Sequence, residues 1–464
     1  MPVEGRGLSS RRTQQVERGR RLSNLSTPIT VQKLQTALHA KAKSEAGYRF
    51  YALYDKIYRS DILFHAWNQC RSNKGAPGVD GQDFEEVEKY GVLRWLGELA
   101  QALKTGTYQP EPIRRVFIPK ANGKLRPLGI STLRDRVCMT AAMLVLNPIF
   151  EADLPDELYA YRPGRNAQQA VIEVEETLFH GRREVVDADL ADYFGSIPHV
   201  ELMLSLARRI QDKRVLHLIK MWLESTVEEA DRRARKSRTT EAKDKGRGIP
   251  QGSPISPLLA NVYMRRFVLA WKKFGLGVSL GAKLVTYADD LVILCGKGKA
   301  QEALQRMRDI MGKLKLTVNE EKTRICKVPE GSFDFLGYTF GRLYSPRTGK
   351  ARIGMRPSKK SIKRMVEKVH ELTDRKTSWQ ETTEVVGKLN RSLRGWANYF
   401  KVGSDSQAYQ ALDNYTAPRL RWWLRFKYNL RNRKGGTYPL SHLYGHIGLV
   451  RLSVRGREQA WVKA

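Results

Sequence analysis

Two adjacent carboxylates interrupt an apolar run in the second half of the chain. Asp289 and Asp290 lie between the apolar segments 284–285 and 291–294. Both segments are short, rich in β-branched residues and free of Gly and Pro, so we expect two strands with the acidic pair at their hairpin turn. Burying neighbouring carboxylates without compensation is costly, and Mg²⁺, which prefers hard oxygen ligands, removes that cost. A solvated turn, where acidic residues are common, is the alternative interpretation.

A third carboxylate, Asp189, precedes this pair by one hundred positions. The segment 184–190 alternates like a strand, and 191–198 then turns away, so Asp189 is predicted to lie at a strand end. Strand ends and hairpin turns are where two-metal phosphoryl-transfer sites gather carboxylates around metals about 3.5–4 Å apart. Asp187, two residues earlier, would lie on the same face of the predicted strand and is the competing candidate. We prefer Asp189 because the chain bends directly after it.

Composition limits the class of protein. The 464 residues are 41% hydrophobic and contain no internal run long enough to cross a bilayer, which predicts a soluble protein of two to four domains. The first 21 residues are rich in Arg and lack the apolar segment of a signal peptide. The cysteines are far apart and form no CxxC pair, which argues against a disulfide framework and a zinc module and suits a reducing compartment.

The charge points to a polyanionic partner. Formal net charge is +34, and residues 342–464 contain 27 Lys and Arg against 8 Asp and Glu. Trp and Tyr are interleaved with Arg in this region, and no long amphipathic face stands out, so nucleic acid is favoured over a membrane surface.

The rest of the chain reads as helices joined by short strands and loops. A basic hairpin is predicted from strands 114–120 and 124–130 around an Asn-Gly turn; its cations Lys120 and Arg126 suit a triphosphate clamp, with a solvated hairpin as the alternative. A Gly-rich segment, 248–261, is predicted to open a helix. Further helices are expected from about residue 30, at 48–70, 84–104, 132–150, 167–179 and 300–314, and beyond 358, with a surface hairpin or loop at 224–245 and a strand pair at 332–340.

Taken in order, the motifs resemble the group II intron reverse transcriptase and maturase proteins of bacteria. They are KGAPGVDG, IPK with GKLRPLGI, DADLADYF, GIPQGSPISPLLAN, YADD, LTVNEEKT, FDFLGY and RSLRGWANYF, and the resemblance runs from about residue 48 to the end. It implies an α+β right-hand polymerase with fingers, a palm with an antiparallel sheet, and a helical thumb, or X domain, that also binds RNA. The domains expected are a basic arm and helix (1–47), fingers and palm (48–341), and a thumb and maturase domain with a short basic tail (342–464).

The resemblance also implies roles for single residues. Asp189, Asp289 and Asp290, with the backbone carbonyl of Leu190, match the ligands of two Mg²⁺ ions, for which Mn²⁺ is a substitute. Lys322 would donate a proton to pyrophosphate, or is merely solvated.

The nucleotide and nucleic-acid contacts follow in the same way. Lys120 and Arg126 match contacts to the incoming triphosphate, and Phe194 matches the residue that excludes a 2′-hydroxyl, with a core aromatic as its alternative. Gln251 would contact the nucleotide or cap the following helix. Gly195 stands where the family often has Asp, which leaves a local contact in doubt. The implied primer grip is Phe335, Leu336 and Gly337, which would look similar as core strand residues, and the RNA-binding candidates are Arg391, Arg394, Trp396, Arg421, Trp422, Arg425 and Lys427.

The function expected from the resemblance is an RNA-directed DNA polymerase that binds its intron RNA, assists splicing, and copies RNA into cDNA for intron mobility. Its partners would be the intron RNA, an RNA template with a DNA primer, target DNA and dNTPs, without a membrane; it would act as a monomer or homodimer in a cytoplasmic, nucleoid-associated bacterial ribonucleoprotein. No Cys pairs or HNH-like cluster follow the maturase region, so we expect no endonuclease domain. The alternatives are a splicing cofactor that needs no polymerase activity, against which the acidic triad weighs, and a related enzyme co-opted for phage defence or CRISPR spacer acquisition.

Overall fold

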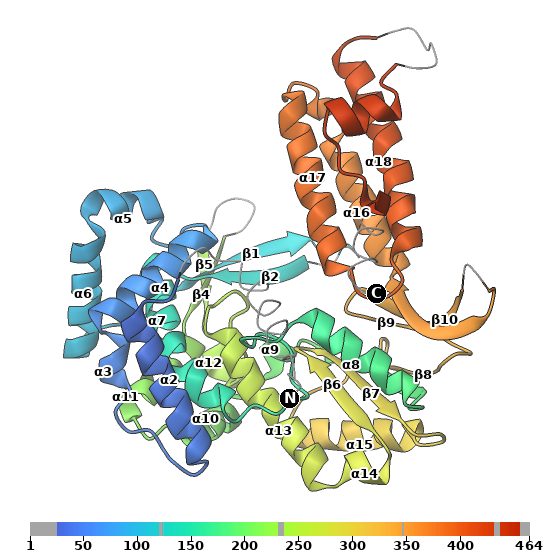
Figure 1. Ribbon diagram of the computed structural model, residues 1–464. Helices are drawn as coiled ribbons and strands as arrows, with labels where there is room; N and C mark the ends of the chain where they lie inside the picture. The colour runs from blue at the N-terminus through green and yellow to red at the C-terminus, as the bar shows by residue number, and fades with distance from the viewer. Residues whose placement is uncertain are drawn as a thin grey trace, which may run out of the picture. The chain divides into compact units, whose positions relative to one another are not determined.

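The computed structural model describes residues 26–119, 123, 125–230, 236–345, 348–430 and 437–454. Its Cα positions divide into two compact units. The described parts of 1–166, 190–275 and 306–319 form the first unit, and those of 167–189, 276–305 and 320–464 form the second. Each unit is therefore assembled from segments that are far apart in the sequence. Figure 1 labels the elements of both units.

The first unit combines helices with one four-stranded sheet of order β2-β1-β4-β5. The antiparallel strand pair of the predicted basic hairpin is confirmed, because β1 and β2 pair from Arg114↔Ile130 to Pro119↔Leu125; most of its Asn-Gly turn lies outside the described residues. The described part of the charged segment 224–245 forms the antiparallel pair β4 and β5 and a short helix. The elements are α2 (Ile29–Ser44), α3 (Tyr54–Ile57), α4 (Ser60–Asn73), α5 (Phe84–Tyr90), α6 (Val92–Thr105), β1 (Ile113–Pro119), β2 (Leu125–Ile130), α7 (Leu133–Glu151), α9 (Tyr193–Ser196), α10 (His199–Ala207), α11 (Lys213–Leu223), β4 (Val227–Ala230), β5 (Lys236–Thr239), α12 (Glu241–Lys245) and α13 (Ser256–Lys273).

Two of the predicted long helices are each broken into two. The helix expected at 84–104 is interrupted at Gly91, whose φ of 106° lies outside the helical region. The helix expected at 48–70 is replaced by α3 and α4. By contrast, the start of α7 agrees with the helix predicted at 132–150. Thr132 caps this helix, because its hydroxyl accepts a hydrogen bond from the Asp135 backbone N–H. Helices α2 and α4 pack against α7, most of whose apolar side chains are buried.

The second unit contains two antiparallel sheets, of order β6-β7-β3-β8 and β11-β10-β9. Helix α8 packs against β6 and β7 (Figure 1). Strand β7 has buried apolar side chains on both faces of the sheet. It pairs with β3 on one side and with β6 on the other. The elements are α8 (Ala167–Phe179), β3 (Glu184–Asp189), α14 (Leu276–Ser279), β6 (Lys283–Tyr287), β7 (Asp290–Cys295), β8 (Arg324–Lys327), β9 (Phe333–Phe335), β10 (Tyr338–Tyr344), β11 (Ala351–Pro357), α16 (Lys359–Leu372), η1 (Arg375–Thr377), α17 (Thr382–Tyr399), α18 (Ser406–Lys427) and η2 (His442–His446); α15 (Ala300–Lys313) crosses from the second unit to the first.

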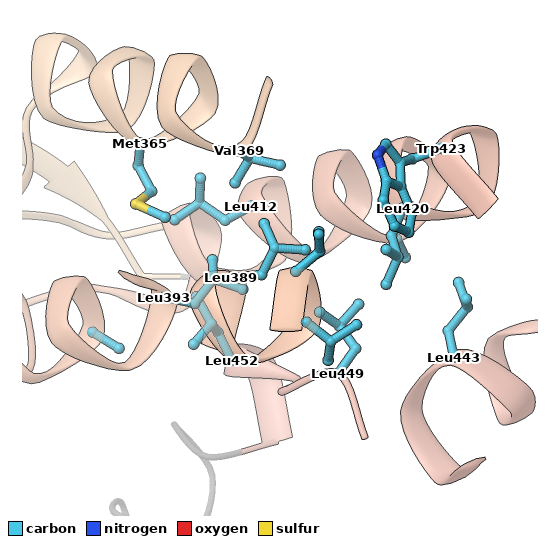
Figure 2. Packing of buried hydrophobic residues seen from close by; sticks show 14 of the residues in the cluster. Met365, Val369, Leu389, Leu393, Leu412, Leu420, Trp423, Leu443, Leu449 and Leu452 are labelled. Carbon is cyan, nitrogen blue, oxygen red and sulfur yellow. The ribbon is translucent and has the colours of Figure 1, made fainter. Parts of the chain in front are cut away.

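Helices α16, α17 and α18 form a helical bundle with its own apolar core. Figure 2 shows Leu389, Leu412, Leu420 and Trp423 pointing into this core, and all four are fully buried. The boundary expected at residue 342 falls inside β10, and β11, which the sequence analysis did not predict, precedes the first helix of the bundle. In the parts of the chain that the structure describes, no helix has both the length and the apolarity needed to span a bilayer.

Candidate active site and nucleic-acid surface

Strands β3 and β7 bring the predicted carboxylates to one edge of the palm sheet. Asp189 is the last residue of β3 and lies directly opposite Asp290, the first residue of β7. Directly opposed residues of antiparallel strands have Cα atoms roughly 4.5–5.5 Å apart. Tyr287 also pairs with Asp290, so Ala288 and Asp289 form a two-residue turn. The turn holds Ala288 at a φ of 57°, a strained conformation for a residue with a Cβ.

Negative charge accumulates at this edge. Dehydration by the surrounding protein, followed by repulsion from Asp289, Asp189 and Asp187, raises the pKa of Asp290 to about 7, although part of its side chain remains exposed. A carboxylate with such a pKa lacks enough compensating positive charge. The edge is therefore suited to a cation.

One cation of the chain already reaches the edge. The Lys322 ammonium lies 2.7 Å from the Asp189 carboxylate, and this hydrogen bond raises the pKa of Lys322. Lys322 is therefore not merely solvated, which was the alternative left open by its sequence. Its ammonium lies on the carboxylate that ends β3.

Asp187, the competing candidate, has a different environment. It lies inside β3, opposite Val292 on one side and Arg324 on the other. The Arg324 guanidinium is 3.3 Å from the Asp187 carboxylate, while burial raises the pKa of Asp187 to about 6. Asp187 thus has a cationic partner within the sheet, whereas Asp189 lies at the sheet edge beside Asp290.

The donor chemistry of the edge fits a hard divalent ion. Three acidic residues occupy one strand end and the adjoining turn, and hard oxygen ligands of this kind suit Mg²⁺, which takes few protein ligands and completes its shell with water and phosphates. The described residues contain no ready-made group of three His, Cys, Asp or Glu side chains placed to hold a metal by themselves. Leu190, whose carbonyl was the fourth predicted ligand, is buried and forms a β-bridge with Val318.

Three of the four predicted nucleotide-binding residues come together in the first unit. The Arg126 guanidinium donates a 3.2 Å hydrogen bond to the Gln251 side-chain oxygen. The Ile249 backbone N–H donates to the Phe194 carbonyl oxygen at 2.8 Å, which ties Phe194 to the segment of Gln251. The fourth residue, Lys120, lies outside the described residues.

The segment around Gln251 does not serve as a helix cap. Helix α13 begins at Ser256, and no side chain caps it, so the capping alternative for Gln251 is wrong. Gly252, with a φ of 106°, lies so close to β2 that a Cβ would be 2.5 Å from the Gly129 carbonyl oxygen. The backbone therefore approaches the basic hairpin at a distance that only glycine allows.

Gly195 borders a cavity of about 510 Å³ in the first unit, and the neighbouring Phe194 is bonded through its carbonyl oxygen to Ile249, which also lines the cavity. Phe194 is partly buried rather than a core aromatic. A Cβ on Gly195 would lie 2.1 Å from an Asp192 carboxylate oxygen, so Asp192 occupies the space that a larger residue would need. This contact accounts for glycine at a position where the sequence departs from the pattern that it resembles. Gly195, Arg115, Phe117, Arg247 and Gln251 are among the residues that line the cavity.

The residues predicted as primer grip form the turn between β9 and β10. Phe335 pairs with Tyr338 and is buried, which leaves Leu336 and Gly337 as the two central residues. Both have positive φ, 49° and 81°, the combination found in tight hairpin turns. Phe335 is thus a core strand residue, and Leu336 and Gly337 are turn residues.

The thumb residues predicted to bind RNA fall into two groups. Arg391 and Arg394 are exposed on α17. Arg421 donates to the Tyr438 carbonyl oxygen, and the Lys427 ammonium donates to the carbonyl oxygens of Ser378 and Gln380, so these two side chains stabilise the bundle itself. Trp396 packs on the bundle core, with its ring 4.5 Å from that of Phe400.

Trp422 belongs to a stack of rings and guanidiniums that sequence reasoning only partly found. Its ring is stacked on Phe426, and Arg419 and Arg375 lie 4.5 and 5.4 Å from its centroid. The spacing of Arg419, Trp422 and Phe426 by three and four residues was the available signal, whereas Arg375 comes from a separate element. A groove of about 560 Å³ along α18 is lined by Pro418, Arg421, Trp422, Arg425, Phe426, Asn429 and Leu430.

Comparison with known proteins identifies the family. Residues 118–340 match the reverse transcriptase (RNA-dependent DNA polymerase) family, and residues 362–438 match the group II intron maturase-specific domain. The chain is 33% identical to protein YkfC of Escherichia coli over 361 residues, which cover 70% of this chain and 92% of that protein. The chain belongs to the group II intron reverse transcriptases and maturases.

Other relatives match over shorter regions. Group II intron-encoded protein LtrA of Lactococcus lactis is 33% identical over 234 residues, which are 48% of this chain and 36% of LtrA. A putative COX1/OXI3 intron 1 protein of Saccharomyces cerevisiae is 26% identical over 327 residues, 38% of its length. This group II intron reverse transcriptase therefore has the expected α+β polymerase fold and a maturase domain, and reverse transcriptases in general use divalent metal ions.

Proposed function

We propose that this group II intron reverse transcriptase copies an RNA template into cDNA at the edge of the palm sheet formed by β3 and the β6–β7 turn. The observation that carries the proposal is the pairing of Asp189 with Asp290, with Asp289 in the adjoining turn. Two Mg²⁺ ions, with Mn²⁺ as a substitute, would be held by Asp189, Asp289, Asp290 and the Leu190 carbonyl, and would stabilise the negative charge of the attacking and leaving oxygens. The high pKa of Asp290 supports a cation at this edge.

The chain's own residues would align the reacting atoms. The primer 3′-oxygen attacks the α-phosphorus of a dNTP, the bond to the bridging oxygen breaks, and pyrophosphate leaves. Lys322, whose pKa is raised by Asp189, remains protonated at neutral pH and supplies a proton to the leaving pyrophosphate. Arg126 and Lys120 bind the triphosphate, and Gln251, held by Arg126, contacts the nucleotide. Phe194 excludes a 2′-hydroxyl, and Phe335, Leu336 and Gly337 grip the primer.

The thumb would bind the intron RNA and assist its splicing. Exposed Arg391 and Arg394 contact phosphates, and the aromatic stack around Trp422 offers a surface for unpaired bases. The proposed RNA-binding surface of the thumb also includes Arg421, Arg425, Lys427 and Trp396. The complex would be a bacterial, nucleoid-associated ribonucleoprotein in the cytoplasm that binds target DNA and makes cDNA for intron mobility.

Primer extension on an RNA template tests the proposal. The intact chain should extend a DNA primer in the presence of Mg²⁺ and prefer dNTPs over NTPs, and Asp289→Ala should abolish extension. Asp55→Ala, which removes an exposed acid outside the motifs named above, is the matched control and should extend normally. Equal extension by Asp289→Ala would make the metal assignment wrong. A chain that promotes splicing without any extension would instead be the splicing cofactor.

A further inference from the structure

The primer-grip turn is held by side chains of the thumb helices. The Tyr399 hydroxyl, at the end of α17, donates a 2.8 Å hydrogen bond to the Leu336 carbonyl oxygen. The Gly337 carbonyl oxygen accepts from the Ser361 hydroxyl and from the Ser358 backbone N–H, each at 2.9 Å. Both carbonyls of this two-residue turn are therefore bonded to the thumb.

Tyr399 is itself fixed from two directions. Its carbonyl oxygen accepts a 2.6 Å hydrogen bond from the Tyr338 hydroxyl, at the start of β10. It also accepts from the Gln168 side-chain amide of α8 at 2.8 Å, and the same amide donates to the Asn398 carbonyl oxygen. The exposed carbonyls at the end of a helix normally need such partners. Here the partners come from the palm, so the end of α17 is joined to the palm through its backbone as well as through the Tyr399 hydroxyl.

The turn depends on external contacts because its own backbone is strained. Leu336 has a φ of 49°, which is uncommon for a residue with a branched side chain. Gly337 leaves no space beside it, since a Cβ there would lie 2.9 Å from the Ser361 hydroxyl and 3.3 Å from the Phe400 ring. The hydrogen bonds from Tyr399 and Ser361 thus hold this strained turn in its observed conformation.

Tyr399 also lies near the acidic edge. Burial, and after it the charges of Tyr287 and Asp290, raise the pKa of Tyr399 to about 12. One aromatic side chain is therefore bonded to the grip turn and neighbours the YADD turn. None of the sequence motifs predicted a role for it.

We propose that Tyr399 is a positioning residue for the primer terminus. Its hydroxyl fixes the Leu336–Gly337 turn to the end of thumb helix α17, so that nucleic acid held by the thumb presents the primer 3′-end to the acidic edge in a single alignment. This role rests on the polymerase function proposed above. It separates two properties of the enzyme: the thumb surface sets the affinity for the primer–template, and Tyr399 sets the rate at which bound primer is extended.

Single-nucleotide addition by the full chain, measured under single-turnover conditions, separates those properties. Tyr399→Phe removes the hydroxyl and keeps the ring, so we expect the maximal rate of addition to fall about 5- to 10-fold, as loss of one ordinary hydrogen bond allows. The Kd for primer–template, measured by fluorescence anisotropy, should change less than about twofold. Ser361→Ala, which removes the bond to the other carbonyl of the turn, should lower the same rate and leave the same Kd.

Tyr409→Phe is the matched control. The Tyr409 hydroxyl, on α18, donates a 3.0 Å hydrogen bond to the Ala397 carbonyl oxygen of α17, two residues before Tyr399, instead of to a carbonyl of the grip turn. Its removal should lower thermal stability to a similar extent as Tyr399→Phe and leave the rate of addition unchanged.

Several outcomes would overturn the role. Tyr399 would serve thumb stability alone if Tyr399→Phe had a normal rate of addition, or if Tyr409→Phe lost as much rate. The same would follow if the rate of Tyr399→Phe fell only in proportion to its loss of affinity for primer–template. If Tyr399→Phe does not fold, a normal rate for Ser361→Ala has the same meaning. An intact chain without any primer extension would remove the proposed function first, whereas an active chain with an active Tyr399→Phe variant would remove only the positioning role.

Discussion

The acidic edge of the palm sheet and the core of the thumb bundle lie in the same unit, but they differ in how well their residues stabilise the folded state. In the thumb, Leu389, Leu412, Leu420 and Trp423 are fully buried among apolar neighbours. A buried acid there, Asp413, is satisfied by hydrogen bonds from the backbone N–H groups of Leu452 and Ser453. At the palm edge, desolvation and then repulsion between carboxylates raise the pKa of Asp290 to about 7. The thumb is complete without a ligand, while the palm edge is not.

The difference shows where residues suited to catalysis lower the stability of the folded protein. The apolar packing of the thumb core favours the folded state, as expected where packing decides the residue type. The palm edge combines like charges with a strained turn at Ala288, and both disfavour folding until a cation and substrate are present. Substitutions at the edge should therefore affect activity and stability in opposite directions, and substitutions in the core should lower both.

Asp290→Asn is the strongest test of this contrast. Loss of one carboxylate of the proposed metal site should reduce primer extension about 10³-fold, the order of effect seen when a group that stabilises transition-state charge is removed. The same substitution removes a repulsive charge, so the metal-free protein should unfold at a higher temperature than the parent at pH 8. Extension assays and thermal unfolding in EDTA measure the two effects. A variant that is both inactive and less stable at pH 8 would contradict the contrast.

The pH dependence of that stability has a definite sign. The pKa of Asp290 is about 7 in the folded protein and near 3.9 in an unfolded chain, so the folded state binds the proton more tightly. Stability contributed by the protonated group is present below about pH 4 and is lost as the pH rises towards 7. The advantage of Asp290→Asn should accordingly be absent at pH 4 and complete above pH 7. Asp55→Asn, at an exposed acid, should show no such dependence.

Leu412→Ala tests the other side of the comparison. Leu412 is fully buried in the thumb core, and truncation of such a side chain costs about 2–5 kcal/mol of unfolding free energy. Because the grip turn is bonded to the thumb, polymerisation should also become more sensitive to temperature. Chemical denaturation and extension assays over a temperature series measure these effects. Unchanged stability would show that the bundle core is not well packed at this site.

The sequence predicted the acidic edge better than it predicted the contacts that support it. The strand end at Asp189, the turn at Asp289 and the basic hairpin each follow from local signals: alternation, short β-branched runs and turn residues. The break at Gly91 was missed because helical periodicity continues across it. Strand β11 was missed because no element was predicted between residues 340 and 358; it is defined by its pairing with β10, which a local pattern does not show.

Residue roles in the thumb show the same limit. Basic composition predicted RNA contacts for Arg391, Arg394, Arg421 and Lys427 alike, but composition does not tell a cation that faces solvent from one that bonds a carbonyl. The structure separates them, because Lys427 and Arg421 bond backbone oxygens of the bundle. Tyr399 could not be predicted either, since its bond to Leu336 joins positions 63 residues apart. Such pairings need the fold itself.

Asp413→Ala should have an intermediate effect on the thumb. The substitution leaves the backbone N–H groups of Leu452 and Ser453 without their carboxylate partner. An unsatisfied buried donor costs about 1–3 kcal/mol, and the loss should be concentrated in the segment that follows η2. Hydrogen exchange would detect faster exchange at residues 452 and 453, with little change at the palm edge. Equal changes in both regions would show that the effect of the Asp413 hydrogen bonds is not local to the thumb.

The smallest expected effect distinguishes cations that bind RNA from cations that bind the bundle. Arg394→Gln removes an exposed cation of α17, so the slope of log affinity against log salt for single-stranded RNA should become shallower by about 0.7, the value for one phosphate contact. Lys427→Gln removes a cation already held by the carbonyl oxygens of Ser378 and Gln380, so it should change the slope less and lower the melting temperature more. Filter binding over a salt series, paired with thermal unfolding, measures both. If Lys427→Gln changes the slope as much as Arg394→Gln without loss of stability, its ammonium faces the RNA and the composition-based prediction holds for it after all.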